Sequence, residues 1–79
     1  MTNDLDDKVK NIIAITLNVP ADKVTSDLAI GDIPEWDSVA NVRILQLLEE
    51  TFDIEINVID ALDAEDVFDF TKLVKTYLA

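Results

Sequence analysis

The N-terminal part of the chain has the apolar spacing of an amphipathic helix. Its apolar face occupies positions i, i+4, i+7, i+8, i+11 and i+12, namely Leu5, Val9, Ile12, Ile13, Thr16 and Leu17. Asn3 or Thr2 can cap this helix, acidic residues in its first turn suit the helix dipole, and Pro20 ends it. The pattern therefore predicts a helix over about residues 3–18.

A long stretch without helical spacing follows over residues 19–36. It contains the only glycine of the chain, Gly31, and both prolines, Pro20 and Pro34, which interrupt regular structure. A loop of this length in a compact domain is usually functional or packed on the core. We expect both, with Trp36 as an apolar anchor that covers the core.

A second helix is expected from about Asp37 to Thr51. Its apolar residues cover most of the helix circumference and are Val42, Ile44, Leu45, Leu47 and Leu48. A helix that is apolar nearly all round is buried, so we expect this helix to be the central and most buried one. Its polar stripe is narrow and consists of Arg43, Gln46 and Glu50, with Glu49 beside it.

The remaining residues predict a connector and two further helices. Residues 52–56 alternate between apolar and polar side chains, but no other segment could pair with them as a strand, so we expect an extended connector. Residues 58–67 favour a short, irregular third helix, and the spacing from Phe70 to Leu78 predicts a last helix. The predicted fold class is all-α: a four-helix bundle with three long helices, one short helix and a long first loop, in a single domain over residues 1–79.

Composition narrows the range of functions. Seventeen acidic and six basic residues give a net charge of -11, which argues against nucleic acid and anionic membranes and favours basic protein surfaces as partners. Because the chain has no cysteine and no histidine, disulfides, thiolate zinc sites and histidine-based catalysis are excluded. The N-terminal residues lack the apolar segment of a signal peptide, and no apolar run has the length of a membrane span. We expect a cytoplasmic monomer.

An acidic cluster precedes and begins the last helix and consists of Asp60, Asp63, Glu65, Asp66 and Asp69. It lacks the alternating oxygen ligands and the central glycine of an EF-hand loop. The pattern favours a solvated acidic face and no metal site, with a small calcium buffer as the alternative.

Ser38 is the candidate functional residue, because it opens the second helix directly after Trp36 and Asp37. A hydroxyl at a helix N-terminus is exposed among unpaired backbone donors, which suits the covalent attachment of a phosphate-linked group. An Asp-Ser pair at this point is also compatible with a simple helix cap. Without a histidine or lysine base beside it, Ser38 is not expected to be a catalytic nucleophile.

The stretch from Ile33 to Val42, which contains Trp36-Asp37-Ser38-Val39, leads into the run from Leu47 to Ile56. Together they resemble the carrier-protein family, the acyl carrier and peptidyl carrier proteins, whose attachment motif is Asp-Ser-Leu. In that family an apolar helix ending in acidic residues follows the motif, and then Phe and an Ile-x-Ile-like connector. The resemblance covers the whole chain and implies a carrier-protein type of helical bundle that is not an enzyme.

The resemblance implies a role for Ser38 as the attachment site of phosphopantetheine, with Asp37 as its recognition neighbour. A separate magnesium-dependent phosphopantetheinyl transferase would transfer the group from coenzyme A. The thiol of the arm would then hold an acyl or aminoacyl group as a thioester for loading and acyl-using enzymes. An apolar cargo would tuck between helices beside Val42, Leu45 or Ile56.

The resemblance also implies a partner-docking face, which consists of Val39, Ala40, Arg43, Gln46, Glu49 and Glu50. A plain solvated helix face is the alternative. Arg43 stands where fatty-acid carriers typically have an acid, which favours a specialised biosynthetic pathway. We expect acyl cargo, because strong acidity is more typical of acyl carriers. An aminoacyl or peptidyl carrier and an unmodified acidic helical adaptor remain the alternatives.

Overall fold

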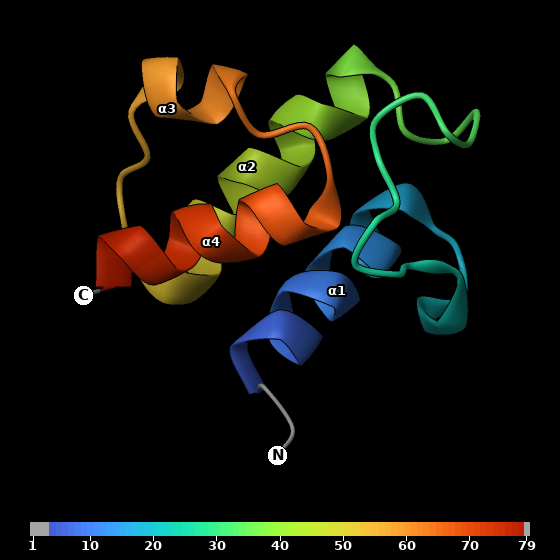
Figure 1. Ribbon diagram of the computed structural model, residues 1–79, viewed down its shortest axis with the longest axis horizontal. Coiled ribbons are helices and arrows are strands. Elements are labelled where there is room, and N and C mark those ends of the chain that lie inside the picture. The colour runs from blue at the N-terminus through green and yellow to red at the C-terminus, as the bar shows by residue number, and fades with distance from the viewer. Residues whose placement is uncertain (1–3, 79) are drawn as a thin grey trace.

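A computed structural model describes residues 4–78, and this part of the chain is all-helical, as predicted (Figure 1). Three long helices, α1 (Asp4–Leu17), α2 (Ser38–Phe52) and α4 (Val67–Leu78), are joined by the short α3 (Val58–Leu62). The long first loop lies between α1 and α2 and contains one 3-10 turn, η1 (Ala21–Lys23). The predicted caps Thr2 and Asn3 lie outside the described residues.

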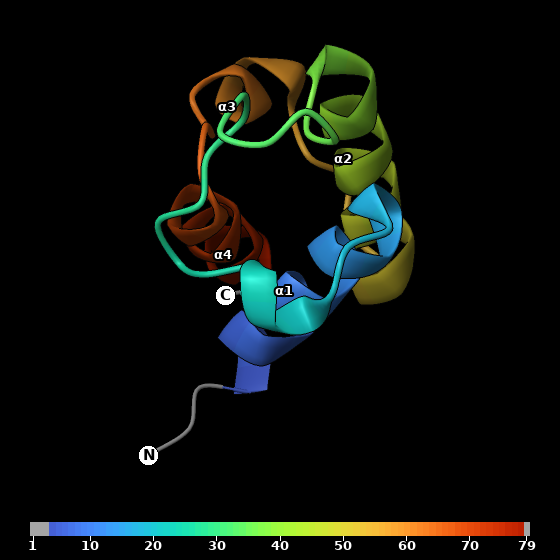
Figure 2. The ribbon, with the colours of Figure 1, turned by 90° about the vertical axis from the view of Figure 1, so that its right-hand side faces the viewer.

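The core lies where α1, α2 and α4 meet, whereas α3 lies on the opposite side of the molecule from α1 (Figures 1 and 2). Its largest fully buried side chains are Val9, Ile13, Trp36, Ile44, Leu48, Val67, Phe70 and Val74. A polar contact also crosses this interface: the hydroxyl of Thr71 on α4 donates to Asp6 of α1 at 3.0 Å. Burial of these apolar side chains supplies most of the stability of so small a domain.

The prediction that the second helix is the most buried one was wrong. Only Ile44 and Leu48 of α2 are buried, whereas α1 and α4 bury four residues each. The apolar Val42 is 55% exposed. The reason is that α1 and α4 cover only part of the circumference of α2, and Val42 and Leu45 line a cavity beneath α3 instead.

The boundary between the last two helices also differs from the prediction. The third helix ends at Leu62 and not at residue 67, and the last helix begins at Val67 and not at Phe70. Side-chain caps explain the earlier start, because a carboxylate oxygen of Asp66 accepts from the backbone N–H of Asp69 at 2.8 Å. In return, the carboxylate of Asp69 accepts from the N–H of Glu65 at 3.1 Å, in a reciprocal arrangement similar to a capping box.

The first loop is tied to the link before α4, which confirms the expectation that it packs on the core. The N–H of Ile30 donates to the carbonyl of Glu65 at 2.9 Å, and Ala29 and Asp66 form an isolated antiparallel bridge. The loop ends at Trp36, which is 1% exposed and packs against Phe70 with ring centroids 6.2 Å apart. These contacts hold the residues just before α2 in place.

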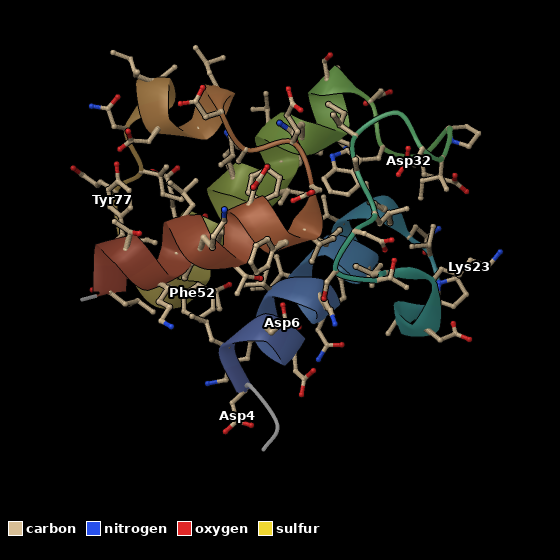
Figure 3. The ribbon with its side chains drawn as sticks, in the orientation of Figure 1. Asp4, Asp6, Lys23, Asp32, Phe52 and Tyr77 are labelled. Carbon is tan, nitrogen blue, oxygen red and sulfur yellow. The ribbon has the colours of Figure 1, made fainter. Side chains whose placement is uncertain are left out.

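The connector between α2 and α3 contains no strand, as expected. Asp53 adopts a left-handed conformation at the end of α2, with φ of 53°, and turns the chain into residues 54–57. Tyr77 lies near the end of α4 beside this connector (Figure 3). Its hydroxyl accepts from the N–H of Asn57 at 2.9 Å and donates to the carboxylate of Asp60 at 2.5 Å.

Candidate functional site

Ser38 is the first residue of α2, and its side chain is exposed. The preceding residue, Asp37, has an extended backbone, and its side chain accepts from the N–H of Ala40 at 2.8 Å. Asp37 is therefore the N-cap of α2, so the predicted second helix begins one residue later than expected. The capping also fixes where the hydroxyl of Ser38 leaves the helix.

Ser38 lies in the wall of a cavity of about 520 Å³ between α2, the connector and α3. Most of the lining is apolar and comes from Ile30, Val42, Leu45, Ile56, Val58, Ala61, Leu62 and Ala64. The polar lining residues are Ser38, Asn41, Gln46 and Glu49. The three residues expected beside an apolar cargo, Val42, Leu45 and Ile56, all line this cavity.

The short helix α3 covers the cavity incompletely. Ala61 is its only buried residue, while Val58 and Leu62 line the cavity and remain more than 70% exposed. Because little apolar surface is buried under α3, side-chain hydrogen bonds contribute much of what holds it. The cavity is therefore only partly closed on the side of α3.

Asn41 is a cavity residue that sequence reasoning missed. Its side-chain oxygen Oδ1 accepts from the indole Nε1–H of buried Trp36 at 3.0 Å. It lies three residues after Ser38, so the two side chains share one face of α2. The available signal was this i, i+3 spacing to the serine, combined with a tryptophan whose indole N–H needs an acceptor once it is buried.

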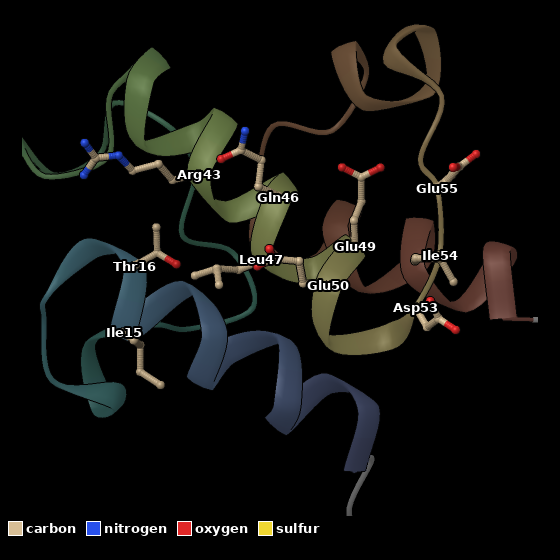
Figure 4. A pocket seen from close by; sticks show the side chains of 10 residues that line it. All are labelled: Ile15, Thr16, Arg43, Gln46, Leu47, Glu49, Glu50, Asp53, Ile54 and Glu55. Carbon is tan, nitrogen blue, oxygen red and sulfur yellow. The ribbon is translucent and has the colours of Figure 1, made fainter.

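The predicted docking face is largely exposed. Val39, Arg43, Gln46 and Glu50 are exposed, whereas Ala40 and Glu49 are half-buried. Arg43, Gln46, Glu49 and Glu50 also line an open groove of about 860 Å³ beside α1 (Figure 4). Arg43 forms no ion pair with any residue between 4 and 78.

Among the side chains of this face, that of Glu49 makes a hydrogen bond within the fold. Its carboxylate accepts from the backbone N–H of Ile56 at 2.9 Å, which ties the connector back to α2. In Figure 4 its side chain points toward the α3 side of the molecule. Glu49 thus positions the connector at the far end of the cavity from Ser38.

Comparison with known proteins identifies the family. The chain is 39% identical over 54 residues to an acyl carrier protein of Akkermansia muciniphila, covering 68% of each chain. It is 36% identical over 59 residues to an acyl carrier protein of Buchnera aphidicola subsp. Schizaphis graminum, covering 75% of each. The chain belongs to the acyl carrier protein family. No protein-family model matches it.

As a member of this family the chain is a carrier protein that works with partner enzymes, and it is not itself an enzyme. Acyl carrier proteins normally carry phosphopantetheine. The residues fit such a group, because Ser38 offers an exposed hydroxyl at the edge of an apolar cavity. The carrier has no cysteine, so an attached arm would bring its only thiol.

The acidic cluster of the carrier does not assemble a metal site. No group of three or more potential metal ligands occurs within residues 4–78. Three carboxylates of the cluster instead accept hydrogen bonds within the fold, those of Asp60, Asp66 and Asp69. None of the helices in the described part of the chain is both long and apolar enough to cross a membrane.

Proposed function

We propose that this carrier holds acyl intermediates as thioesters on a phosphopantetheine arm attached to Ser38. The observation that carries the proposal is the position of Ser38 at the start of α2 and in the wall of an apolar cavity, within a chain of this family. A separate phosphopantetheinyl transferase would make the phosphodiester bond to Oγ, as the hydroxyl loses its proton, the pyrophosphate bond of coenzyme A breaks and adenosine 3′,5′-bisphosphate leaves. Ser38 supplies the hydroxyl, and Asp37 would be the neighbour that the transferase recognises.

The start of α2 is suited to a phosphodiester. The N–H groups of Ala40 and Asn41 already donate to Asp37, to its side chain and its carbonyl respectively. No hydrogen bond joins the N–H groups of Ser38 and Val39 to another residue within 4–78, as is usual for the first turn of a helix. These donors and the positive end of the helix dipole would stabilise the negative charge of the phosphate.

The cavity favours acyl over aminoacyl cargo. Eight of its twelve lining residues are apolar, so an alkyl chain would be buried there without the cost of desolvating a charge. An α-ammonium group would have to lose its hydration among these apolar side chains, and Glu49 is the one carboxylate in the lining. The proposal therefore retains acyl cargo, with the alkyl chain between α2 and α3.

The proposal also covers the enzymes that would dock on this carrier and the compartment in which it would act. The transferase and the loading and acyl-using enzymes would dock on the face of Val39, Ala40, Arg43, Gln46, Glu49 and Glu50. The exposed and unpaired Arg43 would favour partners with an acidic residue opposite it, as expected of a specialised pathway. With a net charge of -11, we propose a monomer acting in the cytoplasm on protein partners and not on nucleic acid or membranes.

Intact mass spectrometry tests the proposal directly. The protein is incubated with coenzyme A, magnesium and a broad-specificity phosphopantetheinyl transferase, with Ser38→Ala as the matched control. We expect a mass gain of one phosphopantetheine group that the control lacks, while both proteins remain helical by circular dichroism. If folded protein gained no mass with several transferases, Ser38 would be only a helix residue and the unmodified adaptor would be the better explanation.

A further inference from the structure

The side-chain amide of Asn41 has a defined orientation. An indole N–H can only donate, so the oxygen of Asn41 must face the Nε1 of Trp36, at 3.0 Å. The amino group Nδ2 therefore points away from the indole. Because Trp36 is 1% exposed and packs on Phe70, the indole that sets this orientation is itself held in the core.

The amino group of Asn41 has no acceptor within residues 4–78. Every fully buried polar side-chain atom in this part of the chain has a hydrogen-bond partner, so Nδ2 is not fully buried and reaches solvent. Asn41 is half-buried and lines the same cavity as Ser38. The carrier thus has an oriented pair of N–H donors with no protein acceptor, one helical turn from the serine hydroxyl.

We propose that Asn41 is a binding residue for the arm attached to Ser38. Its Nδ2 donates a hydrogen bond to an oxygen near the start of the arm, either of the phosphate or of the first amide carbonyl. This inference rests on the proposed attachment at Ser38. The bond directs the arm along the face of α2 that lines the cavity.

The chemistry of the site supports this assignment. Residues three apart on a helix have Cβ atoms about 5–6 Å apart, a separation that an asparagine amide and a serine phosphodiester can bridge. A donor that is already oriented loses little rotamer freedom when it binds, because Trp36 has already restricted it. The other amide in the cavity wall, that of Gln46, lies about two turns from Ser38 and has no such contact with an indole.

The test uses the modified protein carrying an isotope-labelled arm, with NMR spectroscopy as the readout. Asn41→Asp keeps an oxygen for Trp36 and the shape of the side chain, but it replaces the donors with a second carboxylate oxygen. Gln46→Glu is the matched control, because it makes the same charge change in the same cavity wall. Mass spectrometry first establishes that each protein is fully modified.

In the wild type, modification should shift the side-chain amide signals of Asn41. In Asn41→Asp, the arm signal that reports the bond should move to its value in the modified protein unfolded in urea, where the phosphodiester is intact and the bond is absent, while Gln46→Glu keeps the wild-type value. A change in the phosphorus signal identifies the phosphate as the acceptor, and a change in the first carbonyl carbon signal identifies the amide. The indole N–H signal of Trp36 checks that the fold is intact.

The inference is overturned if the Asn41 amide signals are the same before and after complete modification of the wild type. This comparison needs no variant, so it decides the question even where Asn41→Asp fails to fold. An equal change in the Gln46→Glu control would also overturn it, because charge alone would then be the cause. Failure of the wild type to be modified is a different result, and it would remove the proposed attachment together with this inference.

Discussion

Three residues around Ser38 have separate physical roles. Asp37 caps α2, Trp36 anchors the preceding loop in the core, and Asn41 joins the anchored indole to the cavity wall. None of these contacts involves the hydroxyl of Ser38. The proposed attachment residue, Ser38, therefore remains accessible while its neighbours hold the start of the helix.

The two proposed roles of Asp37 can be separated by substitution. Asp37→Ala removes the side-chain oxygen that accepts from the N–H of Ala40, and it is expected to lower the free energy of unfolding by about 1 kcal/mol. Asp37→Asn keeps a capping oxygen and should keep most of the stability. Urea unfolding measures both. If the transferase recognises the carboxylate, both variants should be modified more slowly than the wild type. Wild-type modification rates in Asp37→Asn would show that Asp37 acts as a cap alone.

At the scale of elements, α3 depends on contacts made by the connector before it. Glu49 of α2 binds the N–H of Ile56, and Tyr77 of α4 binds both Asn57 and Asp60. The connector and the first turn of α3 are therefore held by one side chain from α2 and one from α4. Changes at either one should therefore act on the cavity wall more than on the core.

Glu49 and Glu50 provide a matched pair that separates structure from docking. Glu49→Ala leaves the N–H of Ile56 without its charged acceptor and should lower the free energy of unfolding by about 1–2 kcal/mol. Glu50→Ala changes an exposed residue and should stay within about 0.5 kcal/mol of the wild type. Chemical denaturation measures both variants. Equal effects would mean that the contact with Ile56 contributes nothing to stability.

Tyr77 gives the contact with α3 a defined pH dependence. Its hydrogen bond to Asp60 raises the pKa of Tyr77 above its ordinary value of 10.0. The protonated phenol makes this bond, so its contribution to stability is fully present below about pH 10 and is lost as pH rises through the raised pKa. Because Tyr77 is the only tyrosine, the ultraviolet absorbance of its phenolate reports this titration alone.

Asp60→Asn tests the cause of the shift. Without the carboxylate, the pKa of Tyr77 should fall back toward 10.0. Asp63→Asn is the control, because it removes an acid from the same segment without touching the hydroxyl of Tyr77. A pKa that is unchanged in Asp60→Asn would show that another group determines it.

At the scale of the whole molecule, charge opposes folding. The net charge is -11, and the ion pairs within residues 4–78 are Lys10–Asp6 and Lys72–Asp69. Most carboxylates therefore have no cationic side chain beside them, and their mutual repulsion disfavours the compact state. The same excess of negative charge would attract partners with basic surfaces.

Salt should therefore stabilise the carrier. Screening shortens the range of repulsion between exposed carboxylates, so the melting temperature should rise between low and physiological ionic strength. For a domain of this size, a gain of about 1 kcal/mol corresponds to a rise of about 4–8 °C. Differential scanning calorimetry across a salt series measures it. A flat melting temperature would contradict self-repulsion as a significant cost.

Local sequence patterns determined the elements of this protein and the position of its candidate site. The apolar spacing predicted α1, α2 and α4, and Pro20, Gly31 and Pro34 predicted the long loop. The motif around Ser38 indicated both a helix start and the family, and its relatives confirm the family. These features depend on neighbours within a few residues, because helical periodicity and capping are local properties.

Only the tertiary structure decided which apolar residues of α2 are buried and which line the cavity. Val42 and Ile44 are equally apolar in the sequence, yet Ile44 is fully buried and Val42 is 55% exposed. The contacts of Glu49 with Ile56 and of Tyr77 with Asp60 join residues 7 and 17 positions apart. Such pairs form only where packed helices bring their ends together, because burial and long-range hydrogen bonds depend on the neighbours that folding supplies.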